Sequence, residues 1–142
     1  MEKEEYTLEI SANPDQSLIE LVERKIYEHN RSLVGDNNFQ QLAVFARDPR
    51  GEIVGGIIGV IIWKWLHISS LWVRSDVRRQ GIGTKLLSVV ETEAKELGCT
   101  DVFVSTTTYQ TPEFYLRSGF AVFGHLDRYP FHYQRLFLAK ML

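Results

Sequence analysis

A basic, glycine-containing segment spanning residues 74–85 has residue types that could bind phosphate. It holds four basic residues and one acidic residue, a local charge of +3 in a chain whose net charge is −2. Gly81 and Gly83 follow the arginines and open an apolar pattern with helical spacing, which predicts a helix beginning at these glycines. The first N–H groups of a helix lack intrahelical partners, and glycine lets a phosphate approach them closely. The segment therefore predicts a cradle for a polyanionic ligand.

Two common phosphate-binding patterns do not fit this segment. A P-loop needs Lys and then Ser or Thr after its second glycine, whereas Thr84 and Lys85 follow Gly83 in the opposite order. A dinucleotide fingerprint needs a third glycine where the chain has Leu86. A nucleotide-binding protein is therefore a distant alternative. The alternative without a ligand is that the segment is only a glycine-containing turn before a core helix.

The elements that must position this cradle follow from hydrophobic spacing and turn residues. Strands are expected over residues 6–10, 41–47, 53–63, 66–74, 101–106, 120–126 and 135–139. Helices are expected from a cap at Asp15 to residue 33, from Ile82 to Gly98, and from Pro112 to Gly119. Residues 48–51 read as a type I turn joining two of the strands. The order β α β β β α β α β β predicts an α/β (α+β) fold with a mixed sheet, in a single domain over residues 1–142.

Two motifs together resemble the GNAT family of N-acetyltransferases. The family's cofactor motif, Gln or Arg, two variable residues, Gly, a variable residue, then Gly or Ala, is matched by Arg78-Arg79-Gln80-Gly81-Ile82-Gly83. Its second signature, a Tyr in a short helix before Gly-Phe, is matched by Phe114-Tyr115-Leu116-Arg117-Ser118-Gly119-Phe120. The resemblance covers essentially the whole chain. It implies a mostly antiparallel central sheet flanked by helices, and an acyltransferase that moves the acetyl group of acetyl-CoA to an amine within a ternary complex.

The resemblance also implies which residues bind this cosubstrate. Backbone N–H groups of residues 79–84 would hold the pyrophosphate, with positive charge from Arg78 and Arg79, and Lys85 as a further candidate. Leu71 and Val73 would pair by backbone with the pantetheine arm, and the Leu71 N–H would polarise the thioester carbonyl. The implied cofactor-binding residues are Leu71, Val73, Arg78, Arg79, Gln80, Gly81, Ile82, Gly83 and Thr84.

The implied catalytic residues are Tyr115 and His67. Tyr115 is the expected general acid for the leaving thiolate, because a tyrosine with a pKa of about 10 is still protonated at neutral pH. Many family members have a Glu base on the central strand, but residues 66–71 contain no acid, and His67 is their only titratable group. Alternation predicts that His67 lies on the same face as Leu71. Each has a structural alternative, a core aromatic for Tyr115 and a hydrogen-bonded strand residue for His67.

For two roles of the family pattern, the general base and the Asn that contacts the pantetheine, the sequence leaves more than one candidate residue. Ser69 could hold a water in place of a base. The family's Asn after the fifth strand is absent from residues 105–111, where Gln110 or a threonine hydroxyl could substitute.

Composition limits the other function classes. The net charge of −2 argues against a general nucleic-acid binder, and the longest apolar run, residues 53–63, is too short to span a membrane as a helix. The N-terminus is acidic, unlike a signal peptide. A single cysteine, Cys99, permits no intrachain disulfide, and no zinc spacing occurs, so we expect a cytoplasmic protein without metal.

The expected acceptor is a primary amine of a small molecule. Alternatives are a peptide or protein N-terminus or lysine, and a non-catalytic acyl-CoA-binding module. Aromatic residues concentrated in the central and C-terminal parts could line the acceptor pocket or form a homodimer contact: Trp63, Trp65, Tyr109, Tyr129, Phe131, His132 and Tyr133.

Overall fold

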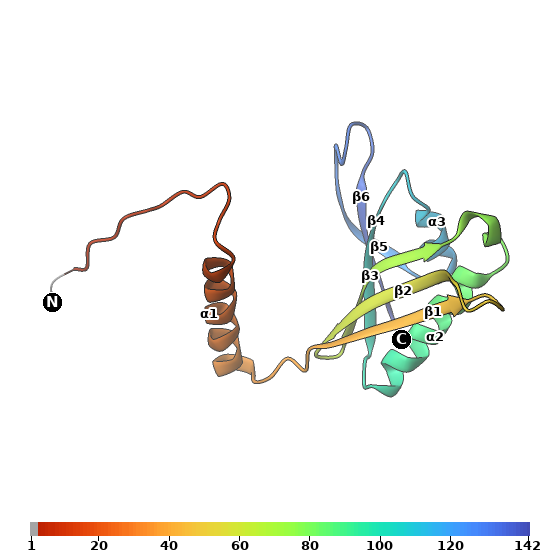
Figure 1. Cartoon of the computed structure of the whole chain (residues 1–142), viewed down its shortest axis with the longest axis horizontal. Helices are drawn as coiled ribbons and strands as arrows, with labels where there is room; N and C mark the ends of the chain where they lie inside the picture. Colours follow the sequence, from red (N-terminus) through yellow and green to blue (C-terminus); the bar gives the residue numbers. More distant parts are fainter. Residues whose placement is uncertain (1–2) are drawn as a thin grey trace. The chain divides into compact units, whose positions relative to one another are not determined.

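The structure is a computed structural model that describes residues 3–142. It divides into two compact units, Met1–Asn37 and Asn38–Leu142. The smaller unit contains one helix, α1 (Gln16–Val34). The larger unit contains a six-stranded sheet and the helices α2 (Ile82–Glu96) and α3 (Pro112–Arg117) (Figure 1). The prediction of a single domain over residues 1–142 stays a prediction.

The sheet has the strand order β1-β2-β3-β4-β6-β5. Its strands are β1 (Gln40–Arg47), β2 (Ile53–Ile62), β3 (Trp65–Val73), β4 (Asp101–Thr107), β5 (Ala121–Leu126) and β6 (Arg135–Met141). Only the central pair, β3 and β4, runs parallel, and the other neighbouring strands are antiparallel. These elements confirm the expected mixed, mostly antiparallel sheet with flanking helices.

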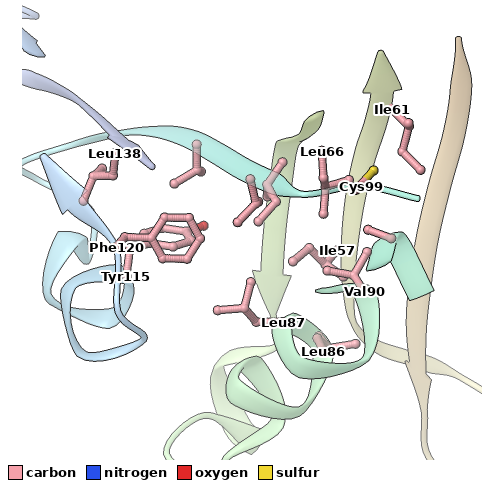
Figure 2. Close-up of a cluster of buried hydrophobic side chains, with 14 residues drawn as sticks. Ile57, Ile61, Leu66, Leu86, Leu87, Val90, Cys99, Tyr115, Phe120 and Leu138 are labelled. Carbon is pink, nitrogen blue, oxygen red and sulfur yellow. The ribbon is translucent and has the colours of Figure 1, made fainter. Parts of the chain in front are cut away.

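The core lies between one face of the sheet and helices α2 and α3. Helix α2 contacts β1, β2 and β3, and its apolar stripe of Leu86, Leu87, Val90 and Ala94 is buried. Figure 2 shows the labelled side chains of α2 meeting those of β2 and β3, with Tyr115 and Phe120 on the α3 side of the cluster. The helix begins at Ile82 because Gly81 adopts a left-handed conformation, and it ends before Gly98, which has φ of 96°.

A bulge in β3 separates this strand from β4. The register with β2 shifts between the pairs Ile58↔Ser70 and Gly59↔Ile68, so that Ser69 is the extra residue on β3. Pairing with β4 extends from Trp65↔Asp101 only as far as Ile68↔Val104. Residues 70–73 of β3 therefore pair with β2 on one side, and residues 69–73 have no ladder partner on the β4 side, within the described part of the chain. We call this side of residues 69–73 the open edge.

Gly59 allows the close approach of β2 to the bulge. A Cβ at this position would lie 2.8 Å from Leu66 Cδ1 and 3.1 Å from the carbonyl oxygen of His67. A side chain at residue 59 would displace β3 at the point where it begins to leave β4.

The expected first strand over residues 6–10 is wrong. Residues 6–10 have no regular secondary structure, and the Leu8 and Ile10 side chains are 99% and 97% exposed. Weak alternation over five residues does not by itself make a strand, because a strand is stabilised by a hydrogen-bonded neighbour, and within residues 3–142 this segment pairs with no strand of the sheet. The observed order therefore begins with α1. Asp15 is its N-cap residue, as expected, but its side chain makes no capping hydrogen bond.

None of the helices in residues 3–142 is both long and apolar enough to cross a membrane.

Candidate active site

The N-terminus of α2 presents backbone donors without protein acceptors. No side chain caps this helix, and the first N–H with an intrahelical acceptor is that of Lys85, which donates to the Gly81 carbonyl at 3.0 Å. In residues 3–142, the N–H groups of Ile82, Gly83 and Thr84 therefore have no protein partner. Gly81 has φ of 79°, and no atom lies within 4 Å of the place where its Cβ would be. The cradle is open and electropositive, as a phosphate group requires.

Arg74 does not contribute to this cradle. Its guanidinium donates to Asp76 at 2.6 and 3.0 Å, and it lies 3.8 Å from Glu52 and 4.0 Å from Asp48. The hydrogen bond from Arg74 lowers the pKa of Asp76, so this carboxylate stays ionised. The local charge of +3 expected from the sequence is therefore not all available to a ligand, because Arg74 is neutralised by its acidic neighbours.

Arg78 connects the cradle to the end of β3. Its Nε donates to the Val73 carbonyl at 2.8 Å, which fixes the guanidinium beside the start of α2. Arg79 has φ of 64°, a left-handed conformation that turns the chain immediately before the helix. Arg78 and Arg79 have no ion-pair partner among the described residues. They are therefore the arginines available to a polyanion.

The open edge of β3 begins next to this cradle. The Arg74 N–H donates to the Val54 carbonyl of β2 at 2.8 Å, so the preceding carbonyl, that of Val73, points away from β2. Because the peptide groups of a strand alternate in direction, the N–H groups of Leu71 and Val73 and the Leu71 carbonyl point to the same open side. Arg78 already occupies the Val73 carbonyl, which leaves three backbone groups for an extended, amide-containing ligand.

The bulge at Ser69 places His67 on the face opposite Leu71. Leu66 and Ile68 are buried in the core, and Leu71 and Val73 pack against the same core. The prediction that His67 and Leu71 share a face is therefore wrong, because one extra residue reverses the alternation. The Ser69 hydroxyl donates to the Ile58 carbonyl at 3.1 Å.

His67 is half-buried and stacked on a neighbouring ring. Its imidazole lies parallel to the Phe103 ring, with 4.3 Å between the centroids. Burial, together with the positive charge of Arg135, lowers the pKa of His67 below its ordinary value. The imidazole is therefore neutral at neutral pH and can accept a proton.

Tyr115 lies in the core, on the face of the sheet that α2 and α3 cover. Its ring is 7% exposed and makes edge contacts with Phe114 and Phe120, at centroid distances of 5.1 and 5.5 Å. Burial raises the pKa of Tyr115 to about 12. Figure 2 shows its hydroxyl pointing away from α3 toward the other side chains of the cluster. No hydrogen bond between described residues occupies this hydroxyl, so it can donate to a ligand.

Gln110 closes the end of β4. Its Oε1 accepts hydrogen bonds from the Thr107 N–H at 3.1 Å and from the hydroxyls of Thr106 and Thr107 at 3.0 and 3.1 Å. The Gln110 oxygen and these two hydroxyls are thus engaged with one another. Of the groups that could replace the missing family Asn, the Gln110 Nε2 is the one that these bonds leave for a ligand.

A cation that the sequence analysis did not single out lies on the same face as His67. Arg135, the first residue of β6, donates from Nε and Nη2 to the Ser105 hydroxyl at 3.1 and 2.7 Å, and from Nη1 to the Tyr129 hydroxyl at 2.9 Å. The side chain of Arg135 points away from the core formed by Leu136 and Leu138. A charged residue at an alternating position of a strand was the signal available in the sequence.

A cavity of about 310 Å³ adjoins the cradle. It is lined by Thr84, Leu87, Ser88, Glu91, Phe114, Arg117, Ser118 and Lys140. Thr84 belongs both to this cavity and to the first turn of α2, so a ligand held at the cradle could extend into it. No cluster of three or more metal-ligating side chains occurs among residues 3–142.

Comparison with known proteins identifies the family. The profile of the acetyltransferase (GNAT) family matches residues 5–120. The chain is 38% identical over 89 residues to blasticidin-S acetyltransferase of Streptomyces morookaense, a match that covers 62% of this chain and 65% of that protein.

Solved structures have the same fold. A crystal structure of an acetyltransferase from Bacillus cereus superposes with a TM-score of 0.87 at 28% identity, covering 94% of this chain and 98% of that chain. An aminoglycoside 6′-N-acetyltransferase complexed with coenzyme A superposes with a TM-score of 0.64 at 21% identity, covering 88% and 87% of the two chains. The family profile, which spans most of the sequence, and the matching fold show that this chain belongs to the GNAT family of acetyltransferases.

Proposed function

We propose that this protein transfers the acetyl group of acetyl-CoA to a primary amine of a small molecule, by direct attack within a ternary complex. The observation that carries this proposal is the set of unpaired N–H groups at Ile82, Gly83 and Thr84, beside the open edge of β3. The first feature suits a pyrophosphate, and the second suits an extended arm with amide groups. Both occur in one continuous segment of the chain.

The residues that would hold acetyl-CoA are those expected from the sequence, except that Arg78 already occupies the Val73 carbonyl. The backbone from Arg79 to Thr84, including Gln80, would surround the pyrophosphate, and the side chains of Arg78 and Arg79 would neutralise it. Leu71 and Val73 would pair with the pantetheine arm through the backbone groups that Arg78 leaves open. When bound, acetyl-CoA supplies an activated acetyl group as a thioester.

Three groups of the chain would assist the transfer, two as hydrogen-bond or proton donors and one as a proton acceptor. The Leu71 N–H would stabilise the thioester oxygen as it becomes negative. Tyr115 would protonate the departing thiolate, because its hydroxyl has no hydrogen-bond partner among residues 3–142 and its pKa of about 12 keeps it protonated. His67 would accept the proton that the amine must lose, because its lowered pKa keeps the imidazole neutral.

The acceptor is proposed from the site and from one relative. The blasticidin-S acetyltransferase is named for a small molecule and is 38% identical over the matched residues. A peptide amine or protein lysine would be the acceptor if small amines fail. A non-catalytic acyl-CoA-binding protein is favoured only by the missing acid on β3 and the missing family Asn.

A screen of primary amines with acetyl-CoA, measured as release of free CoA thiol, tests this function. We expect CoA release with at least one class of small amine and a matching N-acetyl product by mass spectrometry. Peptides with free N-termini or lysines form a second arm. Tight acetyl-CoA binding without release of CoA in either arm would favour the non-catalytic acyl-CoA-binding protein over the enzyme.

Two further predictions accompany this function. The buried Cys99 thiol and the absence of a second cysteine suit a reducing compartment, so we expect the protein in the cytoplasm. A homodimer contact is the alternative role for the aromatic residues of the central and C-terminal parts, and measurement of the molar mass in solution tests for it.

A further inference from the structure

The side chains on the face of the sheet opposite α2 include a half-buried cation without a counter-ion. Arg135 points to this face, and no Asp or Glu among residues 3–142 forms an ion pair with it. Asp127, in the loop that precedes β6, instead accepts a hydrogen bond from Gln134 Nε2 at 2.8 Å and lies 3.5 Å from His125. A partly desolvated guanidinium whose protein partners are all neutral is expected to attract an anion from solution.

Neutral groups hold this guanidinium in one orientation. Two of its donors reach the Ser105 hydroxyl and one reaches the Tyr129 hydroxyl. The rings of Tyr129 and Phe137 lie 5.3 and 5.5 Å from its central carbon. A guanidinium has five N–H donors, so two remain after these three bonds. Two donors on one planar group match the two oxygens of a carboxylate.

The position of Arg135 relates it to the proposed reaction. Ser105 is the β4 residue immediately after Val104, where pairing with β3 ends and the open edge begins. His67, which lies one residue before the last β3–β4 pair, feels the charge of Arg135. The cation is therefore on the His67 side of the sheet, while the α2 cradle and Tyr115 are on the other side. This arrangement places it with the acceptor amine rather than with the pyrophosphate.

We infer that Arg135, held by Ser105 and Tyr129, binds a carboxylate of the acceptor, so that the substrate is a small amine that also carries a carboxylate. This inference rests on the proposed acetyl transfer and specifies its substrate class. Arg135 is then a specificity-determining residue that orients the amine toward the junction of β3 and β4.

Paired probes test the inference. The panel consists of α-, β- and γ-amino acids, each measured beside its carboxamide, with CoA release as the readout. For the wild type we expect kcat/KM to favour at least one amino acid over its carboxamide. In R135Q this preference should shrink by about 10- to 100-fold, the range expected for a lost hydrogen bond to a charged group. Comparing the two ratios cancels the difference in amine pKa between acid and carboxamide.

Three variants distinguish binding from a structural role. R135K keeps the charge without the planar fork, so it should retain part of the preference, whereas R128Q changes an exposed arginine in the preceding loop and should leave the preference unchanged. S105A should weaken the preference without abolishing it, because it removes only the hydroxyl that orients the guanidinium. An equal loss for acids and carboxamides in R135Q would show that Arg135 only supports the fold, and would overturn the inference.

Calorimetry on the protein saturated with CoA separates this inference from the proposed function. If the wild type binds an amino acid but not its carboxamide, and R135Q does not bind the amino acid, the carboxylate site is supported. If in addition no amine is acetylated, that result would overturn only the proposed transfer. Acetylation of amines with no preference for a carboxylate would overturn the inference and leave the transfer in place.

Discussion

Tyr115 combines a buried ring with a hydroxyl that makes no hydrogen bond to another described residue. In Y115F the ring and its contacts with Phe114 and Phe120 remain, so CoA affinity and thermal stability at neutral pH should be close to those of the wild type. Loss of the proton donor should lower kcat by about 10²- to 10⁴-fold, with a smaller change in KM. Steady-state kinetics with a confirmed acceptor measure this. Wild-type turnover in the variant would show that another group or water protonates the thiolate.

The raised pKa of Tyr115 also predicts how stability depends on alkaline pH. An ordinary tyrosine loses its proton near pH 10, whereas Tyr115 keeps it until about pH 12 in the folded protein. Between these values the folded state binds more protons than the unfolded state, so the free energy of unfolding falls as pH rises. The fall attributable to Tyr115 is at most about 2–3 kcal/mol.

Denaturant titrations of wild type and Y115F at several alkaline pH values check this prediction. The difference between the two proteins should be constant below about pH 10 and should then change in favour of Y115F. Parallel curves up to pH 12 would mean that the hydroxyl is hydrated rather than desolvated.

His67 predicts a change in the pH profile of turnover. Its lowered pKa means that the imidazole remains a base below its ordinary pKa of about 6.5. In H67Q the amine must lose its proton unaided, which becomes easier as pH rises toward about 10. The ratio of wild-type to H67Q kcat/KM should therefore be largest near neutral pH and decrease at alkaline pH. A ratio that does not depend on pH would assign His67 a structural role, as a ring stacked on Phe103.

Cys99 makes thiol detection suitable for these measurements. It is the single cysteine of the sequence and is 3% exposed, and burial raises the pKa of its thiol. The thiolate is the reactive form of cysteine. The native protein should therefore contribute almost no background to an assay that measures the thiol of released CoA.

At the level of elements, the turn into α2 can be tested separately from the stability of the helix. Gly81 precedes the helix and Gly98 follows it, with φ of 79° and 96°, and in both cases a Cβ would meet no atom within 4 Å. A valine at either position should impose a similar backbone strain, about 1–2 kcal/mol.

Only G81V should weaken CoA binding, because only this change places a side chain and an altered backbone at the open N–H groups. Calorimetric titration of G81V and G98V with CoA, beside their melting temperatures, makes the comparison. Equal loss of affinity in the two variants would remove the α2 N-terminus from the proposed site.

The residues at which helices begin and end were largely predictable from the sequence. The face of the sheet on which a strand residue lies was less predictable. The ends of helices α2 and α3 are indicated by residues with special backbone geometry, and the structure confirms both helices. These residues are Gly81, Gly98, Pro112 and Gly119. The face of His67 was not predictable, because a bulge depends on how β2 and β3 pair, and alternation along β3 does not reveal it.

The candidate site shows the same difference. The cradle could be predicted because its residues are consecutive in the sequence. The group of Arg135, Ser105 and Tyr129 could not, because hydrogen bonds between distant segments assemble it. Engagement of Arg74 by Asp48 and Glu52 likewise depends on contact between the β1–β2 turn and the segment after β3.

For the whole molecule, acetyl-CoA should raise the melting temperature, because a ligand that binds only the folded state stabilises it. At a concentration of 100 times its Kd the gain in the free energy of unfolding would be about 2.7 kcal/mol. ATP and NAD, matched in concentration, should stabilise far less, because they lack the pantetheine arm. Equal stabilisation by ATP without any by CoA would contradict the family-based site. Thermal denaturation followed by circular dichroism measures these shifts.

The short pairing of β3 with β4 has a mechanical consequence. Among residues 3–142, the ladder that joins the β1-β2-β3 half of the sheet to the β4-β6-β5 half extends only from Trp65↔Asp101 to Ile68↔Val104, and we call this ladder the seam. The hydrophobic core also links the two halves, but along the open edge no backbone hydrogen bond between described residues does. A pantetheine arm paired with Leu71 and Val73 would take the place of a neighbouring strand along this edge. Hydrogen exchange at the seam amides should therefore slow when CoA binds, so that the substrate temporarily completes the hydrogen bonding of the sheet that holds it.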